Sequence, residues 1–372
     1  MIILYIAVAL LALLFMITIH ELGHYLAAKA LKIKVHEFAI GFGKAIFKRT
    51  SKKTGEIFSI RLIPLGGYCA FAGDTADSMD GKTEQNEKLA DGSVNEKAYI
   101  PYDKQPPWKR LITLFAGGFA NFICAIVFLW VLLMVLGYYN TVEVRSFDVA
   151  HNDLRTGDVI VEIDGRPLTF LNNFNVLTSE MATGADNGVY FTVIRAGQTT
   201  SEQVFIYRDR IVQGGRDYVG IGLRESTVHW QSMGVFEAIP QAFVFSGELA
   251  WFMLRIFFEL ITGQRSINDV GGPITTISFM SEAVGASLMN LLILIPLISI
   301  NLAVFNLLPI PALDGARMVF VTIEWIRRKP INPVIENRIH GIGLLILFGL
   351  VIILDLNNIF FSSVTMYNVM LC

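Results

Sequence analysis

The chain has 372 residues, of which 53% are hydrophobic and only 17% are charged, and its formal net charge is −2. Soluble domains usually carry about 25% charged residues, so this composition indicates an integral membrane protein. The small net charge gives no reason to expect a nucleic-acid partner, and three widely separated cysteines predict neither a disulfide framework nor a thiol nucleophile.

The first predicted element is a membrane span over residues 1–31, and it contains a His-Glu-x-x-His motif at residues 20–24. On a helix, His20 and His24 share one face and can bind one metal ion, while Glu21 can handle a proton. Ionisable groups inside a span are costly and usually functional. The sequence therefore predicts a hydrolytic metal site within the membrane.

Residues 32–110 form the predicted segment between the first two spans. Within it, residues 41–71 are typical of two strands around a polar turn at residues 50–55, which predicts a β-hairpin. Residues 75–96 are polar, acidic and rich in Gly and Asp, and they predict a mobile loop. A second apolar span is predicted over residues 111–138.

Residues 139–227 have the composition of a soluble domain, and residues 154–168 resemble the core of a bacterial PDZ domain, an α+β module. Such a domain either binds an exposed substrate terminus or filters by size the substrates that reach the spans.

In the next predicted region, residues 228–287, four charged residues interrupt the apolar stretch 235–262. This favours an amphipathic helix at the membrane surface. The alternative is that this stretch crosses the membrane fully, which would reverse the membrane orientation of every later segment.

The third predicted span, residues 288–315, ends in Asn-x-x-Pro-x-Pro-x-Leu-Asp-Gly. Its two prolines break the helix, and non-helical backbone at membrane depth is tolerated only where it is buried in protein or lines a wet cavity. Asp314 directly follows the break, so its carboxylate can be aimed at the first helix. Because a catalytic zinc usually has three protein ligands, Asp314 is the predicted partner of His20 and His24.

A cytoplasmic loop at residues 316–340, a fourth span at 341–356 and an outer tail at 357–372 complete the predicted plan. The positive-inside rule assigns the basic segments 32–110 and 316–340 to the cytoplasm. Both termini and the inserted domain are then extracytoplasmic. Both motifs are expected near the cytoplasmic face.

The two motifs together resemble the site-2 proteases, zinc intramembrane metalloproteases, in the bacterial regulator-of-sigma-E type with a single PDZ domain. The resemblance implies that Zn²⁺ is bound by His20, His24 and Asp314. It implies that Glu21 is the general base toward a zinc-activated water, and that Asn306 is a catalytic residue that holds the substrate or its oxyanion.

The implied fold is a multi-span α-helical membrane protein with four transmembrane helices, a membrane-associated β-hairpin and an inserted extracytoplasmic PDZ domain. The implied activity is hydrolysis of peptide bonds in or near transmembrane segments of pre-trimmed, single-span proteins. Examples are anti-sigma factors and signal-peptide remnants, met in the lipid of a bacterial inner membrane.

The family's membrane-dipping β element can pair with an unwound substrate as an added strand. The corresponding substrate-binding residues expected here are Ile60, Leu62, Gly66 and Gly67. A hairpin that merely packs against the helices is the alternative.

Three rival interpretations stand beside this one. A prenyl-protein endopeptidase of the zinc type would use Glu as its third ligand and more spans, and the Leu-Asp-Gly motif argues against it. Two His and one carboxylate can also hold non-haem iron, but the Glu beside the first His favours zinc. A non-proteolytic membrane PDZ scaffold with an inactive metal site is the non-enzymatic alternative.

Overall fold

The structure is a computed structural model that describes residues 2–73, 100–135, 138–147, 154–168, 188–207, 209–213, 216–220, 223–231, 233–263, 272–286 and 288–361. The predicted mobile loop at residues 75–96 lies outside these residues, as does the tail after residue 361. The chain divides into two compact units, residues 1–128 with 250–363, and residues 129–249 with 364–372.

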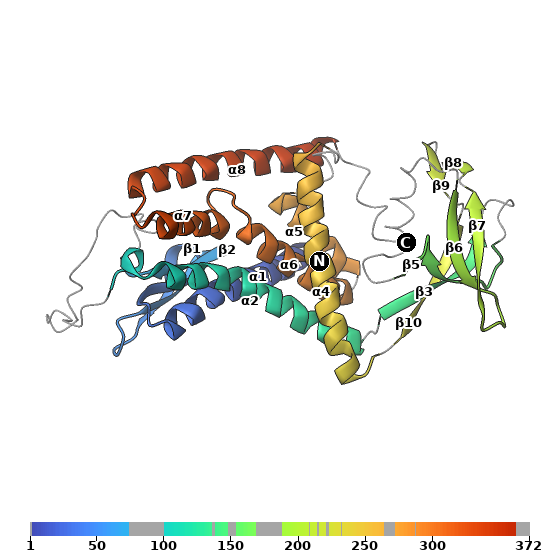
Figure 1. The fold of residues 1–372 in the computed structure, drawn as a ribbon, viewed down its shortest axis with the longest axis horizontal. Coiled ribbons are helices and arrows are strands. Elements are labelled where there is room, and N and C mark those ends of the chain that lie inside the picture. Colours follow the sequence, from blue (N-terminus) through green and yellow to red (C-terminus); the bar gives the residue numbers. More distant parts are fainter. Residues whose placement is uncertain are drawn as a thin grey trace. The chain divides into compact units, whose positions relative to one another are not determined.

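Helices dominate the first unit (Figure 1). They are α1 (Ile2–Ala30), α2 (Pro107–Val135), α5 (Pro273–Ala286), α6 (Leu288–Leu307), α7 (Asp314–Arg327) and α8 (Pro333–Phe361). A short 3₁₀ helix, η1 (Tyr102–Lys104), leads into α2. Helix α2 and helix α4 (Val235–Ile261) each cross the boundary between the two units.

Among the described residues, three helices are long and apolar enough to cross a membrane: Ile3–Ala30, Pro107–Val135 and Pro333–Leu356. They correspond to the predicted first, second and fourth spans. Where the third span was predicted, α6 has a shorter apolar stretch, Leu291–Leu307. The protein is therefore a helical membrane protein, and the number of four spans stays a prediction.

Apolar contacts hold α1 against α5 and α6. Ala9 and Met16 of α1 are fully buried and pack in one cluster with Met280, Leu291 and Leu294. Residues 228–287, which the sequence predicted as one surface-lying region, thus contain two separate helices, and α5 packs on the first span. The start of α5 also lies close to α8, because a Cβ on Gly272 would stand 2.5 Å from the Asp355 carboxylate of α8.

The predicted hairpin is a sheet made of β1 (Val35–Thr50) and β2 (Ile57–Phe71), so both strands are longer than the sequence suggested. Both strands bend, and Phe38 pairs with Phe58 on one side and with Cys69 on the other. A cluster of buried side chains joins this sheet to the end of α1: Ala28, Ile33, Val35, Phe38, Cys69, Phe71 and Tyr102.

The predicted loop at residues 316–340 is mostly helical, because α7 runs to Arg327 and α8 already begins at Pro333. A partly buried ion pair fixes α7 to α2, with Arg110 Nη1 2.6 Å from Glu324 Oε2. The other Glu324 oxygen accepts a hydrogen bond from the Ile331 backbone N–H at 2.9 Å. The turn between α7 and α8 is therefore tied to the same carboxylate.

The second unit contains a sheet with the strand order β10-β3-β4-β6-β7, in which β5 also pairs with β4. Its strands are β3 (Tyr138–Phe147), β4 (Val159–Ile163), β5 (Arg166–Pro167), β6 (Gly188–Ile194), β7 (Ser201–Tyr207) and β10 (Leu223–Gln231). A separate pair is formed by β8 (Asp209–Gln213) and β9 (Arg216–Gly220). All strand pairings are antiparallel, and the predicted PDZ identity of this unit stays a prediction.

Candidate active site

His20 and His24 lie one turn apart on the same face of α1, as their spacing requires. Their rings meet edge to face with centroids 4.7 Å apart, and the residues are only 7% and 6% exposed. The two Nε2 atoms are 3.1 Å apart. Helix α1 therefore presents two ring nitrogens to one point in the interior.

The helix break predicted from the two prolines lies between Leu307, the last residue of α6, and Asp314, the first residue of α7. Within it, Ala312 has a φ of 81°, a left-handed conformation that residues other than glycine rarely adopt. The Ala312 backbone N–H donates to His340 Nδ1 of α8 at 3.0 Å. Gly343 of α8 also lies against the break, since a Cβ there would stand 2.1 Å from Pro311. Helix α8 thus supports the segment that carries Asp314.

Asp314 completes a cluster of three potential metal ligands with His20 and His24. Its Oδ2 atom lies 3.0 Å from His20 Nε2 and 3.1 Å from His24 Nε2. In a tetrahedral zinc site with bonds of about 2.0–2.1 Å, two ligand atoms stand roughly 3.3–3.4 Å apart. A small outward movement of the three groups would admit the ion. Two imidazoles and one carboxylate leave a fourth position for water, so these residues fit a catalytic zinc.

The orientation of the His24 ring is fixed from α2. Its Nδ1 atom lies 2.8 Å from the Thr113 carbonyl oxygen, so Nδ1 carries the proton and donates it. The Nε2 lone pair then faces Asp314 and His20. A hydrogen bond from the second ring nitrogen is the usual way in which proteins orient a histidine ligand.

Glycine allows α1 and α2 to approach closely beside the two histidines. A Cβ on Gly117 would stand 2.3 Å from His24 Nε2 and 2.8 Å from His20 Cε1. A Cβ on Gly23 would stand 2.3 Å from the Ala116 carbonyl oxygen. Both distances are too short for any substituent, so the crossing of these helices depends on glycine.

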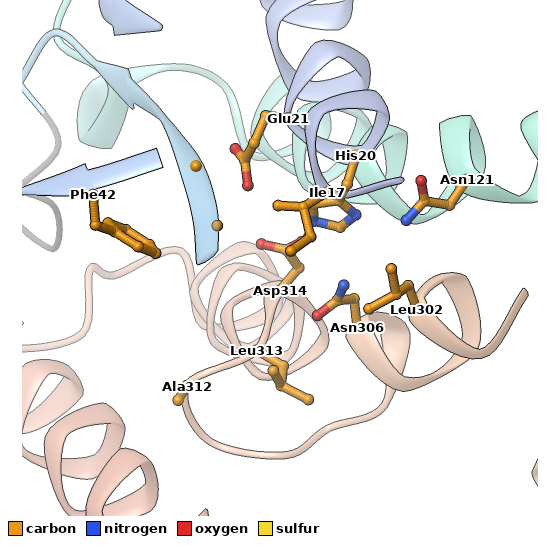
Figure 2. A pocket seen from close by; sticks show the side chains of 12 residues that line it. Ile17, His20, Glu21, Phe42, Asn121, Leu302, Asn306, Ala312, Leu313 and Asp314 are labelled. Carbon is orange, nitrogen blue, oxygen red and sulfur yellow. The ribbon is translucent and has the colours of Figure 1, made fainter. Parts of the chain in front are cut away.

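Glu21 lies beside this cluster and faces a cavity of about 280 Å³ (Figure 2). The backbone amide of Cys69 in β2 is within hydrogen-bonding reach of the Glu21 carboxylate. The cavity is lined by Ile17, His20, Glu21, Phe42, Gly66, Gly67, Asn121, Leu302, Asn306, Ala312, Leu313 and Asp314. The structure therefore brings the predicted acid–base residue and the predicted Asn306 to the same cavity as two of the three predicted ligands.

The four predicted substrate-binding residues divide into two pairs. Gly66 and Gly67 line the cavity, and a Cβ on Gly67 would stand 2.8 Å from the Ala39 carbonyl oxygen and 3.5 Å from Glu21 Cγ. Ile60 and Leu62 are not among the lining residues, and they are 41% and 64% exposed on the sheet.

Three residues of α2 were not assigned to the site from the sequence: Thr113, Gly117 and Asn121. They recur every four residues and therefore share one face of the helix. That spacing, together with the small residues around Gly117, is a signal in the sequence that could have indicated their role.

The known proteins that this chain resembles are zinc metalloproteases. The model of peptidase family M50 matches residues 8–350 of this chain. The zinc metalloprotease RasP of Oceanobacillus iheyensis is 27% identical over 424 residues, covering 92% of this chain and 96% of that protein. Proteins of Rickettsia conorii and Clostridium perfringens, both with provisional names as zinc metalloproteases, are 29% and 30% identical over 93% and 96% of this chain, and the alignments cover 96% and 99% of their own lengths.

A helical membrane protein in which two histidines and one carboxylate meet beside a glutamate fits the class of membrane metalloproteases. The chain belongs to peptidase family M50, the site-2 protease family. This confirms three predictions from the sequence: the family, the class of zinc metalloprotease and zinc as the cofactor.

Proposed function

We propose that this metalloprotease cleaves peptide bonds in or near the transmembrane segments of single-span proteins that have already been trimmed outside the membrane. The observation that carries the proposal is the position of the ligand cluster on α1. His20 and His24 lie ten and six residues before the end of that apolar helix, which at 1.5 Å per residue is about 15 and 9 Å from Ala30. Only a substrate segment within the membrane can reach such a site.

His20, His24 and Asp314 are the proposed zinc ligands. When bound, zinc supplies Lewis-acid activation of a water molecule and of the scissile carbonyl. Glu21 takes the proton from the attacking water and later delivers it to the leaving amine, which is the work of a general base and then a general acid. Its place at the edge of the cavity, next to His20 in sequence, supports this role.

Asn306 is the proposed partner of the substrate carbonyl. Its side chain projects from the last turn of α6 into the same cavity as Asp314 (Figure 2). A carboxamide N–H aimed at the developing oxyanion stabilises its negative charge.

The segment Gly67–Ala70 of β2 is the proposed platform for the substrate. It pairs on one side with β1, where Ile40 is opposite Gly67 and Phe38 is opposite Cys69. Gly66 and Gly67 line the cavity. Their lack of side chains lets β2 lie close to β1, because a Cβ would stand 2.1 Å from the Phe42 ring at Gly66 and 2.8 Å from the Ala39 carbonyl oxygen at Gly67. A transmembrane helix must be unwound before it is cut, and an added strand holds the unwound backbone extended.

We also propose the predicted topology, with the active site near the cytoplasmic face of a bacterial inner membrane. Basic residues adjoin the ends of the helices that carry the site, among them Lys29, Lys32 and Lys109. Arg327 ends α7, and Arg328 and Lys329 follow it. The second unit would then be extracytoplasmic. As a PDZ domain, it would filter out untrimmed substrates by size, and anti-sigma-factor-like proteins and signal-peptide remnants are the proposed substrates.

The variant Glu21→Gln tests the proposal. The amide keeps the shape of the side chain but cannot accept a proton, so we expect zinc content to stay at the wild-type level and cleavage of a model transmembrane substrate to fall by roughly 10²–10⁴-fold. Glu56→Gln is the matched control, because Glu56 pairs with Lys29 at 2.6 Å and does not line the cavity. Cleavage by Glu21→Gln at the wild-type rate would remove Glu21 as the base.

A further inference from the structure

Two buried polar groups at the cavity lack hydrogen-bond partners, and their chemistry is complementary. His20 directs Nε2 at Asp314 and His24, so the proton of its neutral ring belongs on Nδ1. Nδ1 is buried and has no hydrogen-bond partner among the described residues. Asn121 is fully buried, and neither its Oδ1 nor its Nδ2 has a partner there either. One site thus holds an unused donor beside an unused acceptor.

The register of α1 against α2 places these groups together. His24 contacts Thr113 and Gly117, and His20, one turn earlier on α1, also lies against Gly117, which is one turn later than Thr113 on α2. The two helices therefore run in opposite directions, and Asn121 is on the next turn of the same face of α2. Helical side chains lean toward the N-terminus of their own helix, so His20 and Asn121 lean toward each other.

Two observations agree with this register. His20 and Asn121 line the same cavity. Figure 2 shows the Asn121 amide directed toward the His20 ring. The two ends of a carboxamide are nearly equal in size, so a half-turn of the last side-chain bond exchanges the oxygen and the nitrogen.

The Asn121 turn of α2 is itself anchored. The Ser299 hydroxyl of α6 donates to the Asn121 backbone carbonyl at 2.9 Å, and both residues are completely buried. A buried donor or acceptor that has no hydrogen-bond partner destabilises the fold. A fixed position with two such atoms is therefore expensive unless they are used when the site is loaded.

We propose that Asn121 is the positioning residue of His20, accepting a hydrogen bond from Nδ1–H at Oδ1 and so holding the Nε2 lone pair on the metal. It does for His20 what the Thr113 carbonyl does for His24. The inference rests on the proposed role of His20 as a zinc ligand. Groups that orient a histidine ligand in this way are worth roughly 10–100-fold in metal affinity.

The test is the zinc affinity of the full-length, detergent-solubilised chain, measured by competition with a chelator and without any substrate. Asn121→Leu keeps the size of the side chain and removes the acceptor, so we expect zinc to bind roughly 10–100-fold more weakly. Asn121→Asp keeps an acceptor oxygen, so we expect affinity near the wild-type value. Ser299→Ala is the matched control, since it removes a buried hydrogen bond from the same turn and leaves the amide intact.

Separate measurement of kcat and KM completes the test. For a positioning residue, the zinc-loaded Asn121→Leu enzyme should lose kcat while KM stays unchanged. A raised KM with normal zinc affinity would overturn the inference and make Asn121 a substrate-binding amide. Equal loss of zinc in Asn121→Leu and Asn121→Asp, matched by equal losses in thermal stability, would also overturn it, because the role would then be structural.

Asp314→Ala separates this inference from the proposed function. If that variant loses zinc and the wild type holds it, the proposed ligand set stands whatever the Asn121 variants do. If Asp314→Ala keeps wild-type affinity, the ligand set fails, and the role assigned to Asn121 fails with it.

Discussion

Gly117 determines how closely α2 can support the two histidines. Its Cα lies so close to the His24 ring that any side chain would overlap it. The motif residues of α1 therefore depend on a residue that is 93 positions away from His24 in the sequence. A glycine in an apolar helix does not by itself indicate such a role. The small size of this residue is a requirement of the metal site.

Gly117→Ala is expected to displace the histidine rings and to lower zinc occupancy, because the added methyl group would stand 2.3 Å from His24 Nε2. Gly349→Ala in α8 is the control, since nothing lies within 4 Å of a Cβ there. Alanine is about 1 kcal/mol better than glycine in a helix, so the control should be at least as stable as the wild type. Metal analysis of both purified variants checks this, and full zinc occupancy in Gly117→Ala would contradict it.

The residues proposed to carry out the chemistry could be predicted from the sequence, and those proposed to orient them could not. His20, Glu21, His24 and Asp314 belong to a small set of residue types that bind zinc or move protons, and such types are rare in spans. Thr113 acts through a backbone carbonyl, which any residue has. Asn121 in an apolar helix is equally typical of a packing amide. Roles of this kind follow from the packing of helices.

At the scale of elements, the sheet differs most from its prediction. Alternation and turn residues indicated strands of about eight residues, but they could not show that the strands continue and bend. The bend occurs at Gly41 and Gly43, whose φ values of 87° and 83° favour glycine. It is stabilised by Arg61, which donates to the Gly43 carbonyl at 2.8 Å and to Glu37 Oε1 at 2.8 Å.

Glu37 gives this sheet a dependence on pH. Burial alone would raise the pKa of Glu37, but hydrogen bonds from Ser59 and Arg61 outweigh it and hold the pKa below its ordinary value of 4.5. Because the folded pKa is the lower one, the stabilisation is complete above pH 4.5 and is lost as the pH falls through the folded pKa.

Glu37→Gln tests this dependence by comparison with the wild type. Hydrogen bonds to a charged group contribute about 1.5–3 kcal/mol, so the wild type should be more stable by that amount at pH 7. The difference in thermal stability should shrink as the pH falls below 4.5. Protonation at the metal site affects both proteins equally, so it cancels in the difference between their thermal stabilities. A difference that stayed constant down to pH 3 would refute the role of this carboxylate.

At the scale of the whole molecule, composition and the distribution of Lys and Arg gave the spans and a topology, because both follow from the physics of the bilayer. Composition and charge do not decide whether α6 spans the membrane. Its apolar stretch is short, and the helical conformation is interrupted at Pro309 and Pro311. Hydropathy counts residues and cannot tell a short span from a helix that ends inside the protein.

Cysteine labelling checks the topology in a background that lacks Cys69, Cys124 and Cys372. Gln198→Cys, in an exposed turn of the second unit, should react with a membrane-impermeant maleimide in intact spheroplasts. Lys53→Cys, in the exposed turn between β1 and β2, should react only after the membrane is permeabilised. Labelling of Lys53→Cys in intact spheroplasts would contradict the proposed sidedness.

The 294 residues between His20 and Asp314 also have a consequence during biosynthesis. Ribosomes add roughly 5–20 residues per second, so the histidine pair enters the membrane on the order of 15–60 s before its carboxylate partner is made. Throughout that interval the nascent chain carries only two of the three proposed zinc ligands, so we expect that it cannot hydrolyse its neighbours in the translocon. Proteolytic competence is thus delayed until the last helices have been inserted, without a separate inhibitor.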